Sequence, residues 1–365
     1  MTQRDLAIML GKKESEVSRW FSGRFCISSA TQNLIERVLK EQISSDSQYR
    51  REGCYLKIGV IGTGSIARRF MSEVSYVNGG EIVAAYNPDF IQLEKFCDEF
   101  NIDCRCDSIC QLISLVDAVY IASPIDTHVG YARECLNSKK HVLCEMPFTE
   151  TKDDAKELYK LAKRNNCILL PALKTAFCPS FLKIKEIVSM GMIGEVSDVS
   201  ATVTTLLADN IGTSFYNERL LENATYPLLA IFKLLGLDIK NVRIFKKSRG
   251  AKILFCHVFL EYIDSVASFK IGVGVKSEGS LVISGTKGYV YVPAPWWKTE
   301  YFEVRYENQT YNKKFFFPYE DSGLRYEIQA FIDAINREYG ITEYVTKNEN
   351  LKILEIQNKI LNYGK

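Results

Sequence analysis

The sequence predicts an α/β protein with a doubly wound parallel sheet, a second α/β domain built on an open, largely antiparallel sheet, and a small all-α N-terminal appendage. Three observations lead to this prediction. An apolar run at residues 55–61 ends in a glycine turn; strand and helix patterns alternate from there to about residue 165; and β-branched and aromatic runs dominate beyond residue 170. We therefore expect an appendage at 1–45, a linker at 46–54, the doubly wound domain at 55–170, and the open-sheet domain with closing helices at 171–365.

Composition excludes several classes of protein. With 365 residues and 47% hydrophobic residues, the chain can bury two sizeable cores. The 46 Lys and Arg nearly cancel the 44 Asp and Glu, so no global basic field favours nucleic acid. No apolar run approaches the roughly 20 residues that span a bilayer. The N-terminus lacks the features of a signal peptide, which predicts a cytoplasmic protein.

The cysteines and histidines give little sign of a metal site. In the predicted compartment, the 11 cysteines are expected to be free thiols. Cys104, Cys106 and Cys110 form a cluster, but it has no second cysteine pair or nearby histidine, so these residues are expected to be small side chains around a core strand. No pair of the 3 histidines has the spacing of a zinc site, and we expect no metal.

The appendage is predicted to hold two short helices joined by a tight turn. Its segment TQRDLAIMLGKKESEVSRWFSGR resembles the Cro/repressor type of helix-turn-helix domain, in which the second helix, here about residues 14–21, enters the major groove. That family has a further helix ahead of these two, whereas this chain starts at Met1, so we expect a truncated module. A DNA-inert remnant, a small interaction surface and a DNA-binding element all stay open. The resemblance implies that the groove and phosphate contacts are Ser15, Glu16, Ser18, Arg19 and Arg24.

The glycine turn is the predicted nucleotide site. Gly62 allows a sharp turn after the first strand, and Gly64 leaves room for a pyrophosphate to approach the backbone at a helix N-terminus. Ala67 replaces the third glycine of the dinucleotide motif and still permits close packing of helix on strand. A tight turn without a ligand is the alternative. The expected cofactor contacts in this turn are Gly62, Thr63, Gly64, Ser65, Ile66 and Ala67.

The elements that follow complete the predicted parallel sheet. Strands are expected at 81–86, 117–122 and 141–144, and helices at 91–100, 129–137 and 152–165. Ligands of such sheets bind beyond the carboxyl ends of the strands. The side chains predicted to meet there are Gly62, Asn87, Ser123, Thr127 and Glu145.

The end of the second strand usually distinguishes NAD from NADP. An acidic residue there binds the ribose 2′-hydroxyl, and an arginine nearby accommodates a 2′-phosphate. This chain has Asn87, which neither repels a phosphate nor excludes a ribose hydroxyl, so NAD and NADP both stay open. Asp89 is expected to cap the next helix.

The second domain is predicted from alternating apolar and polar residues. Strands are expected at 196–207, 242–245, 253–262, 266–275, 279–284 and 289–292, and helices at 225–235, 324–338 and 348–361. The aromatic run from Trp296 to Phe317 has two interpretations: an exposed face that pairs subunits, or strands packed over a helix layer.

Five ordered motifs place the chain beside a known family. GTGSIA, SPIDTHVGYARECLNSKKHVLCEMP, KTAFCPSF with MGMIGEV, GTKGYVYVPAPWWK, and RYEIQAFI resemble the Gfo/Idh/MocA family of oxidoreductases over about residues 55–365. The resemblance implies a Rossmann domain, a bound NAD(H) or NADP(H), and hydride transfer at a hydroxyl-bearing carbon of a sugar, cyclitol or diol. It also implies a homo-oligomer that forms through the open sheet.

The same resemblance implies the catalytic positions. The family's Glu-Lys-Pro turn reads Glu145-Met146-Pro147 here, and methionine has no proton to exchange. The family's aspartate, and the histidine or tyrosine four residues on, correspond to Glu222 and Tyr226.

Two further residues are expected near the cleft. A tyrosine is a poor base at neutral pH unless a cation assists it, and the resemblance brings Lys174 close. Lys174 would lower the tyrosine pKa, anchor an anionic substrate, or merely cover apolar packing at the surface. His128 matches a position beside the nicotinamide and is expected to orient cofactor or substrate, whereas His141 and His257 are expected to be structural.

The predicted function is therefore NAD(P)-dependent hydride transfer on a sugar, cyclitol or diol hydroxyl. The catalytic candidates are Tyr226, Glu222, Lys174 and His128. The alternative is a degraded enzyme that senses a nucleotide or sugar and relays its state to DNA or a partner through the N-terminal helices; a sequence-specific repressor is a third interpretation. The cofactor contacts expected beyond the glycine turn are Asn87, Ser123, Pro124, Thr127, His128, Glu145, Met146 and Pro147.

Overall fold

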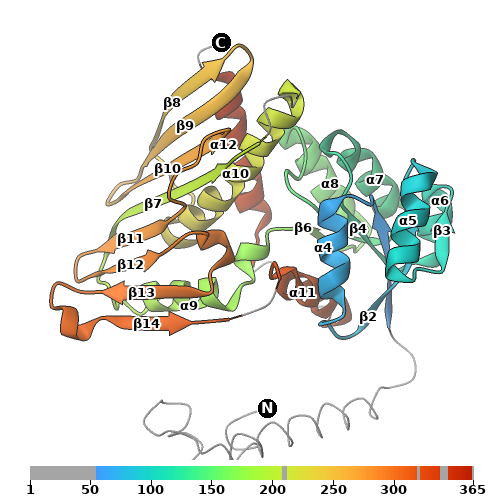
Figure 1. Ribbon diagram of the computed structural model, residues 1–365, viewed down its shortest axis with the longest axis horizontal. Helices are drawn as coiled ribbons and strands as arrows, with labels where there is room; N and C mark the ends of the chain where they lie inside the picture. Colours follow the sequence, from blue (N-terminus) through green and yellow to red (C-terminus); the bar gives the residue numbers. More distant parts are fainter. Residues whose placement is uncertain (1–54, 208–211, 319–320, 338–343, 364–365) are drawn as a thin grey trace, which may run out of the picture. The chain divides into compact units, whose positions relative to one another are not determined.

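Two sheets, each with its own helices, organise the chain (Figure 1). The computed structural model describes residues 55–207, 212–318, 321–337 and 344–363. The predicted appendage and linker, with the DNA-contact candidates, fall on residues 1–54 and lie outside the described residues.

The first sheet has six parallel strands in the order β3-β2-β1-β4-β5-β6, which is the strand order of a Rossmann fold. The central strand β1 (Leu56–Ile61) is buried at five of its six positions, which explains its nearly continuous apolar run. The other strands are β2 (Gly80–Tyr86), β3 (Cys104–Cys106), β4 (Ala118–Ile121), β5 (His141–Cys144) and β6 (Leu169–Pro171).

The helices of this half follow the predicted alternation. Asp89 caps α5, where its side chain accepts a hydrogen bond from Gln92 N, as expected. The α7 helix begins at Ile125, four residues before the predicted start. The helices are α4 (Ser65–Val74), α5 (Phe90–Phe100), α6 (Ile109–Leu115), α7 (Ile125–Asn137) and α8 (Lys152–Arg164).

The second sheet has eight strands in the order β14-β13-β12-β11-β7-β10-β9-β8. Only the β7–β10 pairing is parallel among the neighbours in this order, so the largely antiparallel sheet was predicted correctly. Its strands are β7 (Val196–Thr205), β8 (Asn241–Arg249), β9 (Lys252–Glu261), β10 (Val266–Val273), β11 (Leu281–Gly285), β12 (Tyr289–Val292), β13 (Tyr301–Arg305) and β14 (Lys313–Phe316).

The long helix α10 (Thr213–Leu235) packs against this sheet and starts 12 residues earlier than predicted. The prediction placed Pro227 in the first helical turn, where a missing N–H is harmless. In the structure Pro227 lies inside the helix, and buried residues such as Tyr216 and Leu220 hold the preceding turns against the sheet. Tertiary packing therefore overrides the local signal of the proline. The remaining helical elements of this half are η1 (Lys174–Ala176), α9 (Pro179–Ser189), η2 (Trp296–Lys298) and η3 (Gln309–Tyr311).

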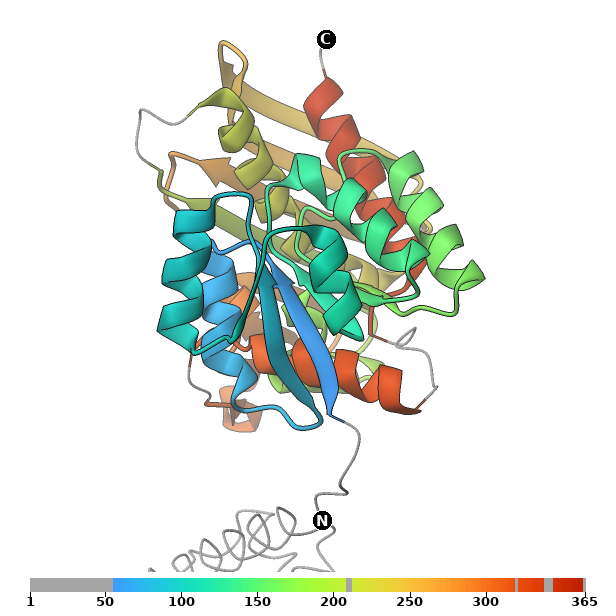
Figure 2. The same cartoon turned by 90° about the vertical axis from the view of Figure 1, so that its right-hand side faces the viewer.

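The two closing helices join the halves. Helix α11 (Leu324–Arg337) lies beside α4, on the Rossmann side (Figure 2), and α12 (Lys347–Asn362) contacts both α8 and α10. Glu73 of α4 is fully buried and accepts hydrogen bonds from the backbone N–H groups of Ser322 and Arg325 and from Arg325 Nε. The start of α11 is thus fastened to the helix that follows the glycine turn.

The aromatic run divides between its two interpretations. Trp296 and Phe302 are fully buried, and Phe302 stacks on Phe315 with ring centroids 4.8 Å apart. Tyr311 and Phe316 are exposed. Packing in the core therefore accounts for part of the run, while Tyr311 and Phe316 are exposed at the surface.

Candidate functional site

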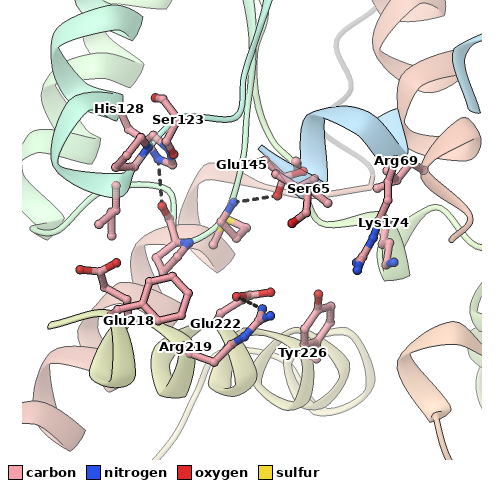
Figure 3. A pocket seen from close by; sticks show the side chains of 18 of the residues that line it. Ser65, Arg69, Ser123, His128, Glu145, Lys174, Glu218, Arg219, Glu222 and Tyr226 are labelled. Carbon is pink, nitrogen blue, oxygen red and sulfur yellow. Dashed lines mark hydrogen bonds and ion pairs between the residues drawn. The ribbon is translucent and has the colours of Figure 1, made fainter. Parts of the chain in front are cut away.

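A cavity of about 290 Å³ lies between the carboxyl ends of the Rossmann strands and helix α10 (Figure 3). Its walls come from α4, from the segments after β4, β5 and β6, from α10 and from α11. In Figure 3 the α10 side chains face the groups from α4 and the β5 end across this space. The predicted site residues that line it are Ser65, Ile66, Ser123, Pro124, His128, Glu145, Met146, Pro147, Lys174, Glu222 and Tyr226.

The glycine turn lies next to the cavity. Its two glycines differ in whether the surrounding protein leaves space for a side chain. Gly62 has φ +97°, and a Cβ added there would lie 2.4 Å from Ala122 O, so this glycine is required by the protein's own packing. A Cβ on Gly64 would meet nothing within 4 Å. Ala67, within α4, is fully buried, as the third motif position requires.

The N-terminus of α4 fits a phosphate group. Gly64 is the N-cap residue of α4 and supplies no side-chain hydrogen bond, so the first-turn amides have no side-chain cap. Open space at Gly64, uncapped amides and the helix dipole together suit the pyrophosphate of a dinucleotide.

Asn87 contributes to the loop rather than to the cavity wall. Its Nδ2 donates a hydrogen bond to Thr63 Oγ1, and its Oδ1 accepts one from Asp89 N at 2.9 Å. This neutral side chain joins the ends of β1 and β2, and it neither attracts nor repels a 2′-phosphate.

His128 holds two loops of the cavity wall together. The ring is 2% exposed, with Nε2 2.9 Å from Ser123 O and Nδ1 3.1 Å from Pro147 O. Burial lowers the pKa of His128, although the backbone carbonyls oppose that shift. Ser123 Oγ also lies 2.7 Å from Thr127 Oγ1. His128 and Thr127 therefore shape the loop after β4, and His128 joins it to the turn after β5.

Glu145 is the carboxyl group at the end of β5. Its Oε1 accepts a hydrogen bond from Tyr120 Oη at 2.5 Å, and its Oε2 accepts one from Met146 N at 3.2 Å. Burial raises the pKa of Glu145 to about 7, and the charge of Glu222 adds to this, while the two hydrogen bonds and Lys174 oppose it. A carboxyl group that titrates near neutrality is suited to proton exchange.

This shift predicts a pH dependence of stability. Between about pH 4.5 and 7 the unfolded chain releases the Glu145 proton while the folded chain retains it, so the free energy of unfolding falls as pH rises through that window. In the wild type we expect this group to lower the free energy of unfolding by on the order of 3 kcal/mol over that window, and Glu145→Gln to abolish this decrease. Urea unfolding of the ligand-free protein at pH 4.5 and pH 8 measures it. Identical pH dependence in wild type and variant would contradict the assignment.

Helix α10 supplies the opposite wall. Glu222 and Tyr226 lie one turn apart on it, and Glu222 forms an ion pair with Arg219. Burial and the charges of Glu222 and Glu145 raise the pKa of Tyr226 far above its usual range. The net shift is upward, opposite to the lowering by Lys174 that was one of the roles left open from the sequence, so Tyr226 stays a neutral hydroxyl, a form that can donate a hydrogen bond.

Lys174 is buried at the base of the cavity, with 8% of its surface exposed. Its Nζ donates a hydrogen bond to Ser322 O at 2.9 Å, in the segment that Glu73 fastens to α4. Burial lowers the pKa of Lys174, Lys298 lowers it further, and Glu327 opposes the shift. A lysine that merely covers surface packing does not fit this environment.

The charged lining residues missed from the sequence are Arg69, Glu218, Arg219 and Glu327. Glu327 is 1% exposed, and burial raises its pKa well above the usual range. A signal for it exists in RYEIQAFI, because Glu327 falls on the same helical face as the buried Leu324, Ile328 and Phe331. A glutamate on an apolar helix face needs a buried partner or a function.

Metal and membrane signals are weak in the part of the chain that the structure describes. Within it, no group of three or more His, Cys, Asp or Glu side chains could hold a metal ion. None of the helices in the described ranges is both long enough and apolar enough to cross a bilayer.

Residues 56–173 match the family model GFO_IDH_MocA, described as "Oxidoreductase family, NAD-binding Rossmann fold". Among curated proteins, a scyllo-inositol 2-dehydrogenase (NADP(+)) of Bacillus subtilis is 31% identical over 133 residues, 36% of this chain. That match spans only 40% of the Bacillus protein. A trans-1,2-dihydrobenzene-1,2-diol dehydrogenase of Mus musculus is 26% identical over 67% of this chain and 77% of its own length.

A solved structure extends the likeness to both sheets. A 3-ketoreductase from Actinomadura kijaniata, in complex with TDP-benzene and NADP, superposes with a TM-score of 0.73 at 19% identity. The alignment covers 84% of this chain and 97% of that one. At this identity the likeness establishes the fold.

Proposed function

We propose that this chain, whose residues 56–173 match the model of the Gfo/Idh/MocA family of NAD-binding Rossmann oxidoreductases, transfers a hydride between NAD(P) and a hydroxyl-bearing carbon of a sugar, cyclitol or diol. One observation carries the proposal. The open, uncapped N-terminus of α4 adjoins a cavity whose far wall and base present Tyr226 and Lys174. The arrangement places polar, proton-bearing groups beside the site that suits a dinucleotide.

The residues divide into cofactor and substrate roles. The cofactor supplies or accepts the hydride, so the chain must bind it and handle one proton. The first turn of α4 and the loops joined by His128 hold the cofactor, while the Tyr226 hydroxyl donates a hydrogen bond to the substrate oxygen. Glu222, paired with Arg219, fixes the substrate-facing side of α10.

The direct test is a change in NAD(P)H absorbance with a substrate panel. The panel contains scyllo-inositol, other cyclitols, hexoses and a trans-dihydrodiol, each with NAD(+) and NADP(+), because relatives with such substrates match parts of this chain. Turnover with at least one pair supports the proposal. No substrate-dependent absorbance change over the whole panel contradicts it.

Met146 supports a second candidate function. Because methionine cannot exchange a proton at the position of the family's lysine, a protein that binds NAD(P) without turnover is the alternative. It would sense a nucleotide or sugar and relay that state to DNA or a partner. The predicted relay falls on residues 1–54, outside the described ones. NADPH binding measured by fluorescence, together with inactivity over the whole panel, would favour this alternative.

A homo-oligomer through the second sheet is also part of the proposal. Phe245 is 63% exposed and Phe259 40%, and their rings meet edge to face at 6.0 Å on neighbouring strands β8 and β9. Both lie opposite the buried side of these strands, and Figure 1 shows no described helix over that face. A cluster of exposed aromatic rings is typical of an interface.

We expect Phe245→Glu to convert the oligomer to a monomer, because a charge cannot be buried unpaired. Sedimentation velocity of wild type and variant measures this. Phe90→Glu is the matched control, since Phe90 is 53% exposed on α5 of the Rossmann half. A monomeric wild type would contradict the interface.

A cytoplasmic location and the choice between NAD and NADP stay predictions.

A further inference from the structure

Two ionisable side chains at the base of the cavity, Lys174 and Glu327, support a role that the proposed function does not assign. Lys174 comes from the segment after β6, and Glu327 from α11, 153 residues further along the chain. Both are buried, both line the same cavity as Tyr226 and Met146, and each acts on the charge state of the other. A buried lysine and a buried glutamate are costly to a fold unless they serve each other or a ligand.

The Glu327 carboxyl group has an unused oxygen. Glu327 Oε2 is buried and has no hydrogen-bond partner among the described residues. An unpartnered buried carboxyl oxygen in a protein calls for an explanation, and one explanation is a partner supplied by the working state of the site. The same cavity holds Lys174 Nζ, whose hydrogen bond to Ser322 O uses one of its three donors.

We propose that Lys174 and Glu327 act as one proton-exchanging pair at the base of the cavity, in place of the lysine that Met146 replaces. This inference rests on the proposed function, because it assigns the proton of that hydride transfer. Lys174 is the catalytic residue that contacts the substrate hydroxyl, and Glu327 is a positioning residue that acts through Lys174.

In the oxidative direction the substrate O–H bond would break and its electron pair would form the carbonyl bond, while a bound NAD(P)(+) would take the hydride from carbon. The hydroxyl proton forms a new N–H bond with the neutral Lys174 amine, and the resulting ammonium is stabilised by Glu327. In the reductive direction the ammonium returns the proton to the carbonyl oxygen.

The charges around the pair favour such exchange. Burial and Lys298 favour the neutral amine of Lys174, while Glu327, Cys178 and Glu145 favour the ammonium. Burial and Glu145 favour the protonated form of Glu327, and Lys174 favours the ionised form. Because each member shifts the pKa of the other, a proton gained by one changes the proton affinity of its partner.

The charge of Glu73, on α4, also favours the protonated form of Glu327. The same Glu73 fastens the segment whose Ser322 carbonyl holds Lys174 Nζ. The position of the lysine is therefore tied to the helix expected to bind the cofactor phosphates.

The first experiment measures kcat, KM and the pH profile of Glu327→Gln, which keeps the size of the side chain and removes its charge. We expect kcat for oxidation to fall about ten- to hundred-fold with KM nearly unchanged. The acid limb of the oxidative pH profile, which reports protonation of Lys174, should move to lower pH. Glu349→Gln is the matched control, because Glu349 is another buried glutamate, paired with Lys233 at 2.8 Å outside the cavity. Thermal melting shows whether each variant folds, and Lys174→Gln tests the pair from its other side.

The second experiment uses the empty lysine position. If the pair replaces the lysine that this chain lacks, Met146→Lys provides an independent proton carrier, and Glu327→Gln should cost less than threefold in that background. A purely structural Glu327 would cost the same factor in both backgrounds. Equal kcat and equal pH profiles for wild type and Glu327→Gln would overturn the proposal and leave the proposed function standing.

The third measurement does not need turnover. Labelling of Lys174 by acetic anhydride, followed by mass spectrometry over a pH series, reports the fraction of neutral amine. Loss of the Glu327 charge should move the Lys174 midpoint about one pH unit lower, because a nearby carboxylate favours the ammonium. If the wild type shows no turnover at all, the proposed function fails, and the labelling profiles still test the Lys174–Glu327 pair. A lower Lys174 midpoint in Glu327→Gln than in wild type supports the pair, and identical profiles overturn it.

Discussion

Gly64→Ala is expected to fold like the wild type and to bind NADPH roughly ten- to hundred-fold more weakly. The backbone of Gly64 has φ −74°, which alanine adopts freely, and an added Cβ meets no protein atom within 4 Å. The methyl group would instead occupy the space over the first turn of α4, where a pyrophosphate approaches the amides. Fluorescence titration with NADPH and thermal melting together measure the effect.

Gly62→Ala should fail for a different reason. Gly62 has φ +97°, and its Cβ would lie 2.4 Å from Ala122 O, so β1 and β4 would have to separate. We expect a loss of at least about 3 kcal/mol in the free energy of unfolding, or no folded protein. Gly130→Ala in α7 is the control, because a Cβ there meets nothing within 4 Å and alanine favours a helix.

The two substitutions separate fold from ligand binding. A Gly64→Ala protein that melts like wild type and binds NADPH with unchanged affinity would rule out a phosphate at this turn. A Gly62→Ala protein of wild-type stability would show that the close approach to Ala122 is not required.

The Rossmann half could be predicted closely because each element has a strong local signal. The strand His141–Cys144 is a buried apolar run with clear borders, and it was predicted at its observed bounds. The strands β3 and β6 were not predicted, because three residues are too few to show a periodicity. Their strand state comes from pairing with β2 and β5 in the sheet.

Site residues in motifs that follow a strand were predicted from the sequence. Site residues that reach the cavity through the packing of distant elements were missed. Ser123 lies two residues after β4 and Glu145 directly after β5, so topology brings them together. Glu327 reaches the cavity only because α11 returns to pack against α4. Burial and two nearby carboxylates raise the pKa of Tyr226, and local sequence does not reveal that environment.

Tyr226→Phe should reduce kcat at least a hundred-fold if the wild type turns over, because it removes the hydroxyl that donates to the substrate oxygen. The ring stays in place against Trp297, with centroids 6.1 Å apart in the native protein, so the fold should be preserved. Steady-state kinetics with the best substrate pair measure the loss, and NADPH affinity serves as the internal control. Unchanged kcat would remove Tyr226 from the reaction.

Met146→Lys tests the same site by adding a proton-carrying group where Tyr226→Phe removes one. The new ammonium would lie beside Glu145, whose carboxylate it stabilises, and would restore the group that the family's Glu-Lys-Pro turn carries. If the wild type is inactive and Met146→Lys turns over, the chain is a degraded enzyme that now binds without reacting. If the wild type turns over and Met146→Lys changes kcat less than tenfold, the proton already has a carrier, and a buried lysine in this cavity, Lys174, fits that role.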